Sequence, residues 1–190
     1  MRSFIVLALS CCFLFACTKK EGTAENTPMT QPKFPEAIEQ VDKALERDLT
    51  DTDFQKGKNL HGIVLKSLVT GKTLNFADYK GKKIIVDFWS SWCIPCIEMF
   101  PDIEKIKKEY EDGKGTVKVL SISVDPMPGK VLEIAKEKGI TFEVIQAPES
   151  LQNAGILLPF TAFADENGVI KETTNGKHSY AEIKKFAGLN

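Results

Sequence analysis

The sequence predicts an α/β domain in which helices flank a mixed central β-sheet, and three observations support the prediction. From about Leu60 onward, short apolar runs alternate with segments of helical periodicity, and Gly, Pro and Asp separate them. The run KKIIVDFWS (82–90) is rich in β-branched and aromatic residues, as in a buried central strand. The chain closes with a hairpin pattern and a covering helix, so antiparallel strands follow parallel ones in a mixed sheet.

Two elements are expected before the central strand. Residues 36–49 (EAIEQVDKALERDL) place apolar side chains at helical spacing and predict a short amphipathic helix. Residues 62–76 (GIVLKSLVTGKTLNF) predict a hairpin that turns at Thr70 and Gly71.

After the central strand, an apolar stripe predicts a helix over 94–110, and Pro101 within it leads us to expect a kink. The stripe consists of Ile97, Phe100, Ile103, Ile106 and Tyr110. The elements expected next are a strand at 116–125, a helix at 129–139 closed by Gly139, a strand at 141–146, a short helix near 149–154, a hairpin of strands 159–165 and 169–173 around the turn ENG, and a helix at 180–188.

The balance of charge excludes two classes of partner. Of 190 residues, 25 are Lys or Arg, 26 are Asp or Glu, and 43% are hydrophobic. This composition is ordinary for one main globular domain with a well-buried core. Because the charges nearly cancel, the chain offers no broad basic surface for nucleic acid or for an anionic membrane.

The first residues, MRSFIVLALSCCFLFAC, predict an export signal. Arg2 precedes an apolar run over 4–16 that would span about 20 Å as a helix, less than the ~30 Å hydrocarbon core of a bilayer. The segment LFAC resembles the lipobox of bacterial lipoproteins, although Phe15 stands where a smaller residue is usual. This resemblance implies lipidation of Cys17. Cys11 is a poorer acceptor because the apolar run before it is short, and a plain secretory signal is the alternative.

Three segments are therefore expected before the folded domain. Residues 18–35 are polar and contain three prolines, so burial cannot offset the entropy of ordering them. The expected segments are a lipoprotein signal peptide at 1–16, a lipid-anchored flexible tether at 17–35, a short helix and linker at 36–56, and the folded domain at 57–190.

Export limits the number of thiols that the mature protein retains. Cleavage after residue 16 removes Cys11 and Cys12, and lipidation occupies Cys17, so only Cys93 and Cys96 remain as thiols. An exported protein works where disulfides persist, so this pair bonds internally or exchanges with other disulfides.

Cys93 falls where the buried strand ends and a helix begins. The unpaired amides and positive dipole end of that helix favour a thiolate, which makes Cys93 the expected nucleophile. Cys96 lies one turn further on and is placed to resolve a mixed disulfide formed by Cys93. Pro95 suits the first turn, where a missing amide hydrogen costs little.

The segment VDFWSSWCIPC (86–96) resembles the thioredoxin active-site motif. Residues 60–190 as a whole are similar to the membrane-tethered periplasmic thioredoxins of the ResA and TlpA type. The similarity includes Pro101 five residues after Cys96, SISVD in the next strand, and LLPFTAFADENGVI near the C-terminus. It implies a thioredoxin-like fold with an N-terminal hairpin extension.

The resemblance also implies roles for several residues. Pro159 matches the family's cis-proline, which exposes the main chain of the preceding Leu158 to an extended substrate. Trp92, adjacent to Cys93, is expected to shield the disulfide and touch substrate. Ile94 and Pro95, between the two cysteines, are expected in the substrate-binding surface too.

Asp87 resembles the buried acid of thioredoxin that shuttles a proton for the resolving cysteine. It lies in an apolar strand, so burial should raise its pKa; a purely structural, hydrogen-bonding role is the alternative. Tethered relatives place a glutamate three residues after the second cysteine. Met99 occupies that position here, and we interpret Glu98 mainly as a favourable charge in the first helical turns.

Together these features predict a thiol-disulfide oxidoreductase of the cell envelope with no cofactor and no metal. No histidine lies between the cysteines to stabilise the thiolate strongly, so a reductant is favoured. The resemblance implies that the substrates are disulfides of exported proteins, including apocytochrome c, and that a membrane thiol carrier donates the electrons. His61 and His178 are expected in solvent-exposed loops.

Two other classes of function compete. A copper chaperone would use the two soft thiolates, but related copper carriers have CxxxC spacing and a well-placed histidine, and structural zinc needs four ligands. A non-catalytic binding module would use the pair as a structural disulfide, but so small a loop removes little chain entropy.

Overall fold

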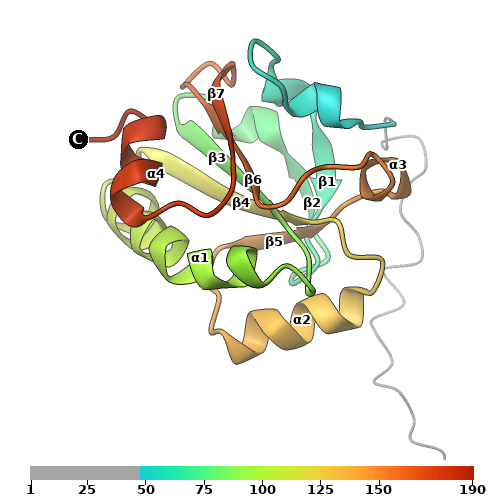
Figure 1. The fold of residues 1–190 in the computed structure, drawn as a ribbon. Helices are drawn as coiled ribbons and strands as arrows, with labels where there is room; N and C mark the ends of the chain where they lie inside the picture. The colour runs from blue at the N-terminus through green and yellow to red at the C-terminus, as the bar shows by residue number, and fades with distance from the viewer. Residues whose placement is uncertain (1–47) are drawn as a thin grey trace, which may run out of the picture. The chain divides into compact units, whose positions relative to one another are not determined.

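The computed structural model describes residues 48–190, which form a five-stranded mixed sheet covered on both faces (Figure 1). Strands β3, β4 and β5 are parallel, and β6 and β7 add to the other side of β3 as antiparallel strands. The order across the sheet is β5 (Glu143–Gln146), β4 (Val117–Ser123), β3 (Lys83–Trp89), β6 (Phe160–Ala164) and β7 (Ile170–Asn175). The expected mixed α/β architecture is confirmed.

Two hydrophobic clusters fill the space on the two faces of this sheet. On one face, buried side chains of the sheet pack against three helices, α1 (Ile94–Ile106), α2 (Pro128–Glu137) and α4 (Tyr180–Phe186). On the other face, the sheet packs against the N-terminal segment, the hairpin and α3 (Glu149–Gln152). Six of the seven residues of β3 are buried, as its apolar sequence predicted.

The N-terminal hairpin forms as expected, with β1 (Val64–Lys66) antiparallel to β2 (Thr73–Asn75). Gly71 adopts a left-handed φ of +68°, which the turn requires and which glycine tolerates best. The hairpin also continues the sheet edge, because the Leu68 N–H donates to the Val144 carbonyl at 2.8 Å.

The folded domain begins earlier than the expected boundary at residue 57. Leu49 is 2% exposed and Phe54 is fully buried, and both belong to the core cluster beneath the hairpin. The predicted signal peptide, Cys17, the tether and nearly all of the predicted helix over 36–49 lie outside the described residues. No helix within residues 48–190 is long and apolar enough to cross a membrane.

The helix that carries Cys96 differs from expectation in its second half. α1 runs without interruption through Pro101, and residues 107–113 then continue as a π-helical turn. A side chain at Gly113 would bring its Cβ to 3.2 Å from the Lys108 carbonyl oxygen, so the wider turn favours glycine there. The apolar stripe predicted a helix here, but seven residues are too few for periodicity to separate π from α geometry.

Candidate active site

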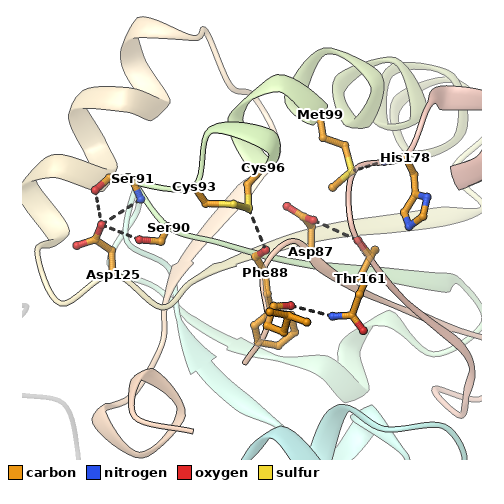
Figure 2. The surroundings of a disulfide bond; sticks show 12 residues. Asp87, Phe88, Ser90, Ser91, Cys93, Cys96, Met99, Asp125, Thr161 and His178 are labelled. Carbon is orange, nitrogen blue, oxygen red and sulfur yellow. Dashed lines mark hydrogen bonds between the residues drawn. A yellow bond between two sulfur atoms is a disulfide. The ribbon is translucent and has the colours of Figure 1, made fainter. Parts of the chain in front are cut away.

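The two cysteines form a disulfide at the junction of the central strand and α1 (Figure 2). Their Cα atoms are 5.3 Å apart. β3 ends at Trp89 and Cys93 is the residue that caps α1, so the strand–helix placement predicted from the sequence is confirmed. The Cys93 carbonyl accepts the Cys96 and Ile97 N–H groups, each at 3.1 Å, which starts the helix at this residue.

The two sulfur-bearing residues differ in exposure. Cys93 is 4% exposed and Cys96 is 0% exposed, whereas Trp92 and Ile94 beside Cys93 are 67% and 62% exposed. Pro95 is exposed as well, at the start of α1. An incoming molecule therefore reaches Cys93 first, and it meets two large apolar side chains there.

The position of Cys93 also sets the electrostatics of its sulfur once the disulfide is reduced. The free N–H groups and the positive dipole end of a 13-residue α-helix lie at this residue. Such a terminus stabilises a thiolate relative to a thiol and lowers the cysteine pKa. Cys96 lies inside the first turn with no exposed surface, so burial opposes ionisation of its thiol.

Asp87 is a fully buried carboxylate in the middle of β3, on the face that α1 covers. Burial raises its pKa well above the usual value for aspartate, and the hydrogen bond from Thr161 at 3.3 Å opposes that rise only in part. Its second carboxyl oxygen has no hydrogen-bond partner. The burial and the raised pKa that the sequence predicted are thus both present.

The Cys96 sulfur lies against the main chain of β3 next to Asp87. The Cys96 sulfur lies 3.9 Å from the carbonyl oxygen of Phe88, the residue that follows Asp87. In the disulfide that sulfur carries no hydrogen, so the contact becomes a hydrogen bond only when Cys96 is a thiol. The reduced state therefore gains a donor beside the buried acid.

Sequence reasoning missed the polar neighbours of Asp87. Asp87 pairs with Ser121 on β4 and with Thr161 on β6, so the three side chains form a row across the sheet on one face. The Ser121 hydroxyl is buried and, like one oxygen of Asp87, has no partner. The only signal in the sequence is a hydroxyl residue at alternate positions of the apolar run SISVD.

The expected cis peptide bond is present between Leu158 and Pro159. Hydrogen bonds fix the chain on either side of Leu158: Gly176 N–H donates to the Pro159 carbonyl at 2.9 Å, and Asn175 Nδ2 donates to the Leu157 carbonyl at 2.8 Å. Within the described part of the chain, no hydrogen bond uses the main chain of Leu158 itself. Its N–H and carbonyl are thus available to another chain.

A groove of about 500 Å³ adjoins this segment. Trp92 and Leu158 connect it to the disulfide side of the domain, and uncharged side chains alone line it. Its apolar wall is made by Val124, Pro126, Ile156 and Leu157. Leu157 is 74% exposed, so the groove keeps a large apolar rim in contact with solvent.

The histidines and the residues after Cys96 depart from expectation in part. Nε2 of His61 and of His178 is buried without a partner, so the expectation of two solvated rings is wrong. The His178 ring packs edge-on against Phe186, and the main-chain N–H of His178 donates to the Met99 sulfur at 3.3 Å. Glu98 pairs with Lys177 at 2.9 Å at the surface.

No group of three or more His, Cys, Asp or Glu side chains in residues 48–190 is arranged to hold a metal ion.

Comparison with known proteins agrees with the fold and identifies the family. The family model described as Redoxin matches residues 48–187. The chain is 30% identical over 143 residues to the thioredoxin-like protein YneN of Bacillus subtilis, covering 74% of this chain and 83% of that protein. It is 31% identical over 132 residues to the thiol-disulfide oxidoreductase ResA of Geobacillus thermodenitrificans, covering 68% of this chain and 74% of that protein.

Solved structures show the same fold. A putative thiol:disulfide interchange protein DsbE from Chlorobium tepidum superposes with a TM-score of 0.61 at 21% identity, covering 72% of this chain and 99% of that one. The chain belongs to the redoxin family and is a ResA-like thiol-disulfide oxidoreductase of the thioredoxin superfamily.

Proposed function

We propose that the chain reduces disulfides of other proteins, with Cys93 as nucleophile and Cys96 as resolving thiol. The observation that supports this most directly is the pair itself: a disulfide at a helix N-terminus, in which Cys93 keeps a small exposed area between two exposed residues and Cys96 has none. Cys96 cannot meet a substrate, and Cys93 stands where a thiolate is favoured.

The exchange proceeds in two balanced steps. The Cys93 thiolate attacks one sulfur of the substrate disulfide, that S–S bond breaks, and the leaving sulfur departs as a thiolate that is protonated. The Cys96 thiol then loses its proton and attacks Cys93, which forms the Cys93–Cys96 disulfide and releases the second substrate sulfur as a thiol. Two electrons pass to the substrate, and the Cys93–Cys96 disulfide is the state expected after that transfer.

Asp87 is proposed as the base that takes the Cys96 proton. A carboxylate with an ordinary pKa is too weak a base for a thiol, and burial corrects this by raising the pKa of Asp87. Met99 is fully buried one turn along α1, at a position where relatives of this type carry an acid. Asp87 therefore performs the proton transfer without a carboxylate at position 99, and the adjacent Glu98 is paired with Lys177 at the surface.

The surface around Cys93 favours a polypeptide substrate. Five large apolar side chains are exposed in residues 48–190, and three of them, Trp92, Ile94 and Leu157, flank Cys93 or line the groove. An extended substrate chain would bond to the free main chain of Leu158 beside Pro159, while its side chains cover this apolar rim. Ile94 and Pro95 would contact it from the other side of Cys93.

The location and the partners complete the proposal. The charged start and apolar run of residues 1–16 support export, with a lipid on Cys17 and residues 18–35 as tether. The domain would then act on the extracytoplasmic side of a membrane. It would be reduced again by a membrane thiol donor and would keep exported proteins, apocytochrome c among them, in the thiol form.

The test uses the mature chain from residue 17 with Cys17→Ser to remove the lipid site, compared with the same chain carrying Cys93→Ser or Cys96→Ser. We expect insulin reduction by dithiothreitol to be accelerated by the first protein and by neither variant. Undiminished turnover in both variants contradicts the assignment. Equilibration with dithiothreitol buffers should give a potential near about −270 mV, and a value near −120 mV contradicts the reductant role.

The partner is identified by trapping. In cells, Cys96→Ser should accumulate mixed disulfides through Cys93, whereas the double variant Cys93→Ser/Cys96→Ser should not. Recovery of exported proteins with the first variant alone supports the envelope role, and recovery of cytoplasmic proteins alone contradicts it.

A further inference from the structure

A buried carboxylate on a neighbouring loop holds the segment that leads to Cys93. Asp125, just after β4, has no exposed surface. Its Oδ2 accepts the Ser90 hydroxyl at 3.1 Å and the Ser91 main-chain N–H at 3.0 Å, and the Ser91 hydroxyl donates to the same oxygen. Figure 2 shows these contacts beside the disulfide. One oxygen thus gathers three donors from the two residues that follow β3.

Asp125 is itself fixed from the other side. Its Oδ1 accepts the Met127 N–H at 2.8 Å, just before α2, and its own N–H donates to the Ser123 hydroxyl at 3.3 Å. Gln146 on β5 donates to the Asp125 carbonyl at 2.6 Å. The carboxylate therefore joins the β3–α1 loop to a part of the fold that β4 and β5 hold in place.

The hydrogen bonds continue to the nucleophile. The Cys93 N–H donates to the Ser90 carbonyl at 3.0 Å, so the residue held by Asp125 also sets the position of Cys93. No step of the proposed thiol–disulfide exchange requires a carboxylate at the position of Asp125. A negative charge near Cys93 would oppose formation of the thiolate, so its charge alone would hinder the reaction.

We propose that Asp125 is a positioning residue that holds Cys93 at the tip of α1 through Ser90 and Ser91. It touches neither sulfur nor substrate, and it acts by keeping the loop in the one arrangement that places Cys93 at the free N–H groups of the helix. The proposal rests on Cys93 being the nucleophile of the proposed function. Burial alone would raise the pKa of Asp125, but hydrogen bonds from Ser91, Met127 and Ser90 outweigh it and lower that pKa, so the acceptor is ionised at neutral pH.

The test measures Cys93 itself. The pH dependence of iodoacetamide alkylation is recorded on the reduced mature chain with Cys17→Ser, alone and with Asp125→Ala, Ser91→Ala or both. Loosening the loop should raise the Cys93 pKa and slow alkylation at pH 7 by about two- to fivefold, the size of a helix-terminus interaction with a charge. If Asp125 acts through the serines, the effects of Asp125→Ala and Ser91→Ala are not additive.

The possible outcomes separate the explanations. Faster alkylation or a lower Cys93 pKa in Asp125→Ala means that the aspartate acts as a charge, which overturns the proposal, as does an unchanged profile or full additivity. Asp165→Ala is the matched control: its carboxylate accepts the Asn167 and Val169 N–H groups at 3.0 and 2.9 Å in the turn before β7, so its loss should lower Tm and leave Cys93 unchanged.

Two further readouts keep the test decisive. If Asp125→Ala does not fold, Ser90→Ala combined with Ser91→Ala removes the same hydroxyl donors, and an unchanged Cys93 profile there overturns the proposal. If Cys93 of the otherwise unaltered chain titrates like free cysteine, the proposed function fails first, which distinguishes that failure from this one.

Discussion

The buried acid under the disulfide makes a prediction about stability whose sign follows from the structure. Asp87 has a folded-state pKa raised well above 3.8 because it is desolvated and one of its oxygens has no partner. The folded protein therefore holds a proton on Asp87 at pH values where the unfolded chain has lost it. The stability that this proton provides is complete below the unfolded pKa and is lost as pH rises through the folded pKa.

The perturbation is Asp87→Asn, which keeps the shape of the side chain and cannot ionise. Below the unfolded-state pKa of aspartate, residue 87 is neutral in both proteins and in both states, so their free energies of unfolding should differ little. Between the unfolded and the folded pKa of Asp87 the wild type loses about 1.4 kcal/mol per pH unit relative to the variant, and above the folded pKa the difference stays constant. One kcal/mol corresponds to roughly 2–4 °C in Tm for a chain of this size, so the variant should gain several degrees at alkaline pH.

The assay is urea unfolding of the protein from about pH 2 to 10; it is kept oxidised so that neither cysteine titrates, and the range covers the acid transition of the control as well. Asp165→Asn is the control of opposite sign, because Lys171 and two main-chain N–H groups outweigh the burial of Asp165 and lower its pKa. The contribution of ionised Asp165 to the free energy of unfolding should be present above pH 4 and lost as pH falls through its lowered pKa. The reasoning is refuted if wild type gains stability relative to Asp87→Asn as pH rises.

Three further predictions concern catalysis, substrate binding and the domain boundary. Asp87→Asn should slow attack by Cys96 by about 10²-fold or more, the usual contribution of a positioned base, and mixed disulfide should then accumulate in single-turnover reactions; an unchanged rate would assign Asp87 a structural role. Leu157→Asp should raise KM for insulin about tenfold and leave the reaction with a small aromatic disulfide unchanged, since only a polypeptide covers the exposed rim; equal effects on both would contradict the groove as a protein-binding surface. Phe54→Ala should cost about 3–5 kcal/mol of unfolding free energy, because Phe54 is fully buried with its ring centroid 4.8 Å from that of Phe88; a cost below 1 kcal/mol would show that the segment is peripheral.

The sequence predicted those features that short stretches of chain determine. The run ending at Trp89 predicted a buried strand because five of the seven residues of β3 are β-branched, aromatic or otherwise apolar, and the cysteines beside Pro95 predicted a helix start. The burial of Asp87 followed from its apolar neighbours. The cis bond at Pro159 came from family resemblance rather than from local chemistry.

The features that the sequence did not predict depend on contacts between distant segments. Ser121 and Thr161 lie beside Asp87 only because of the register of β4 and β6 on β3. Asp125 meets Ser91 for a similar reason, since 34 positions separate them in the chain. His178 is enclosed by Phe186 on α4, which no pattern around the histidine indicates. Such pairings are fixed by tertiary packing, which local periodicity does not encode.

The complete burial of Cys96 limits the covalent chemistry open to this protein. A bulky partner can form an adduct with only one of the two sulfurs, so every productive encounter passes through the same intermediate. Under the proposed mechanism, the lifetime of that intermediate depends on how fast the hidden thiol is deprotonated inside the domain, together with the acidity of the client's leaving thiol.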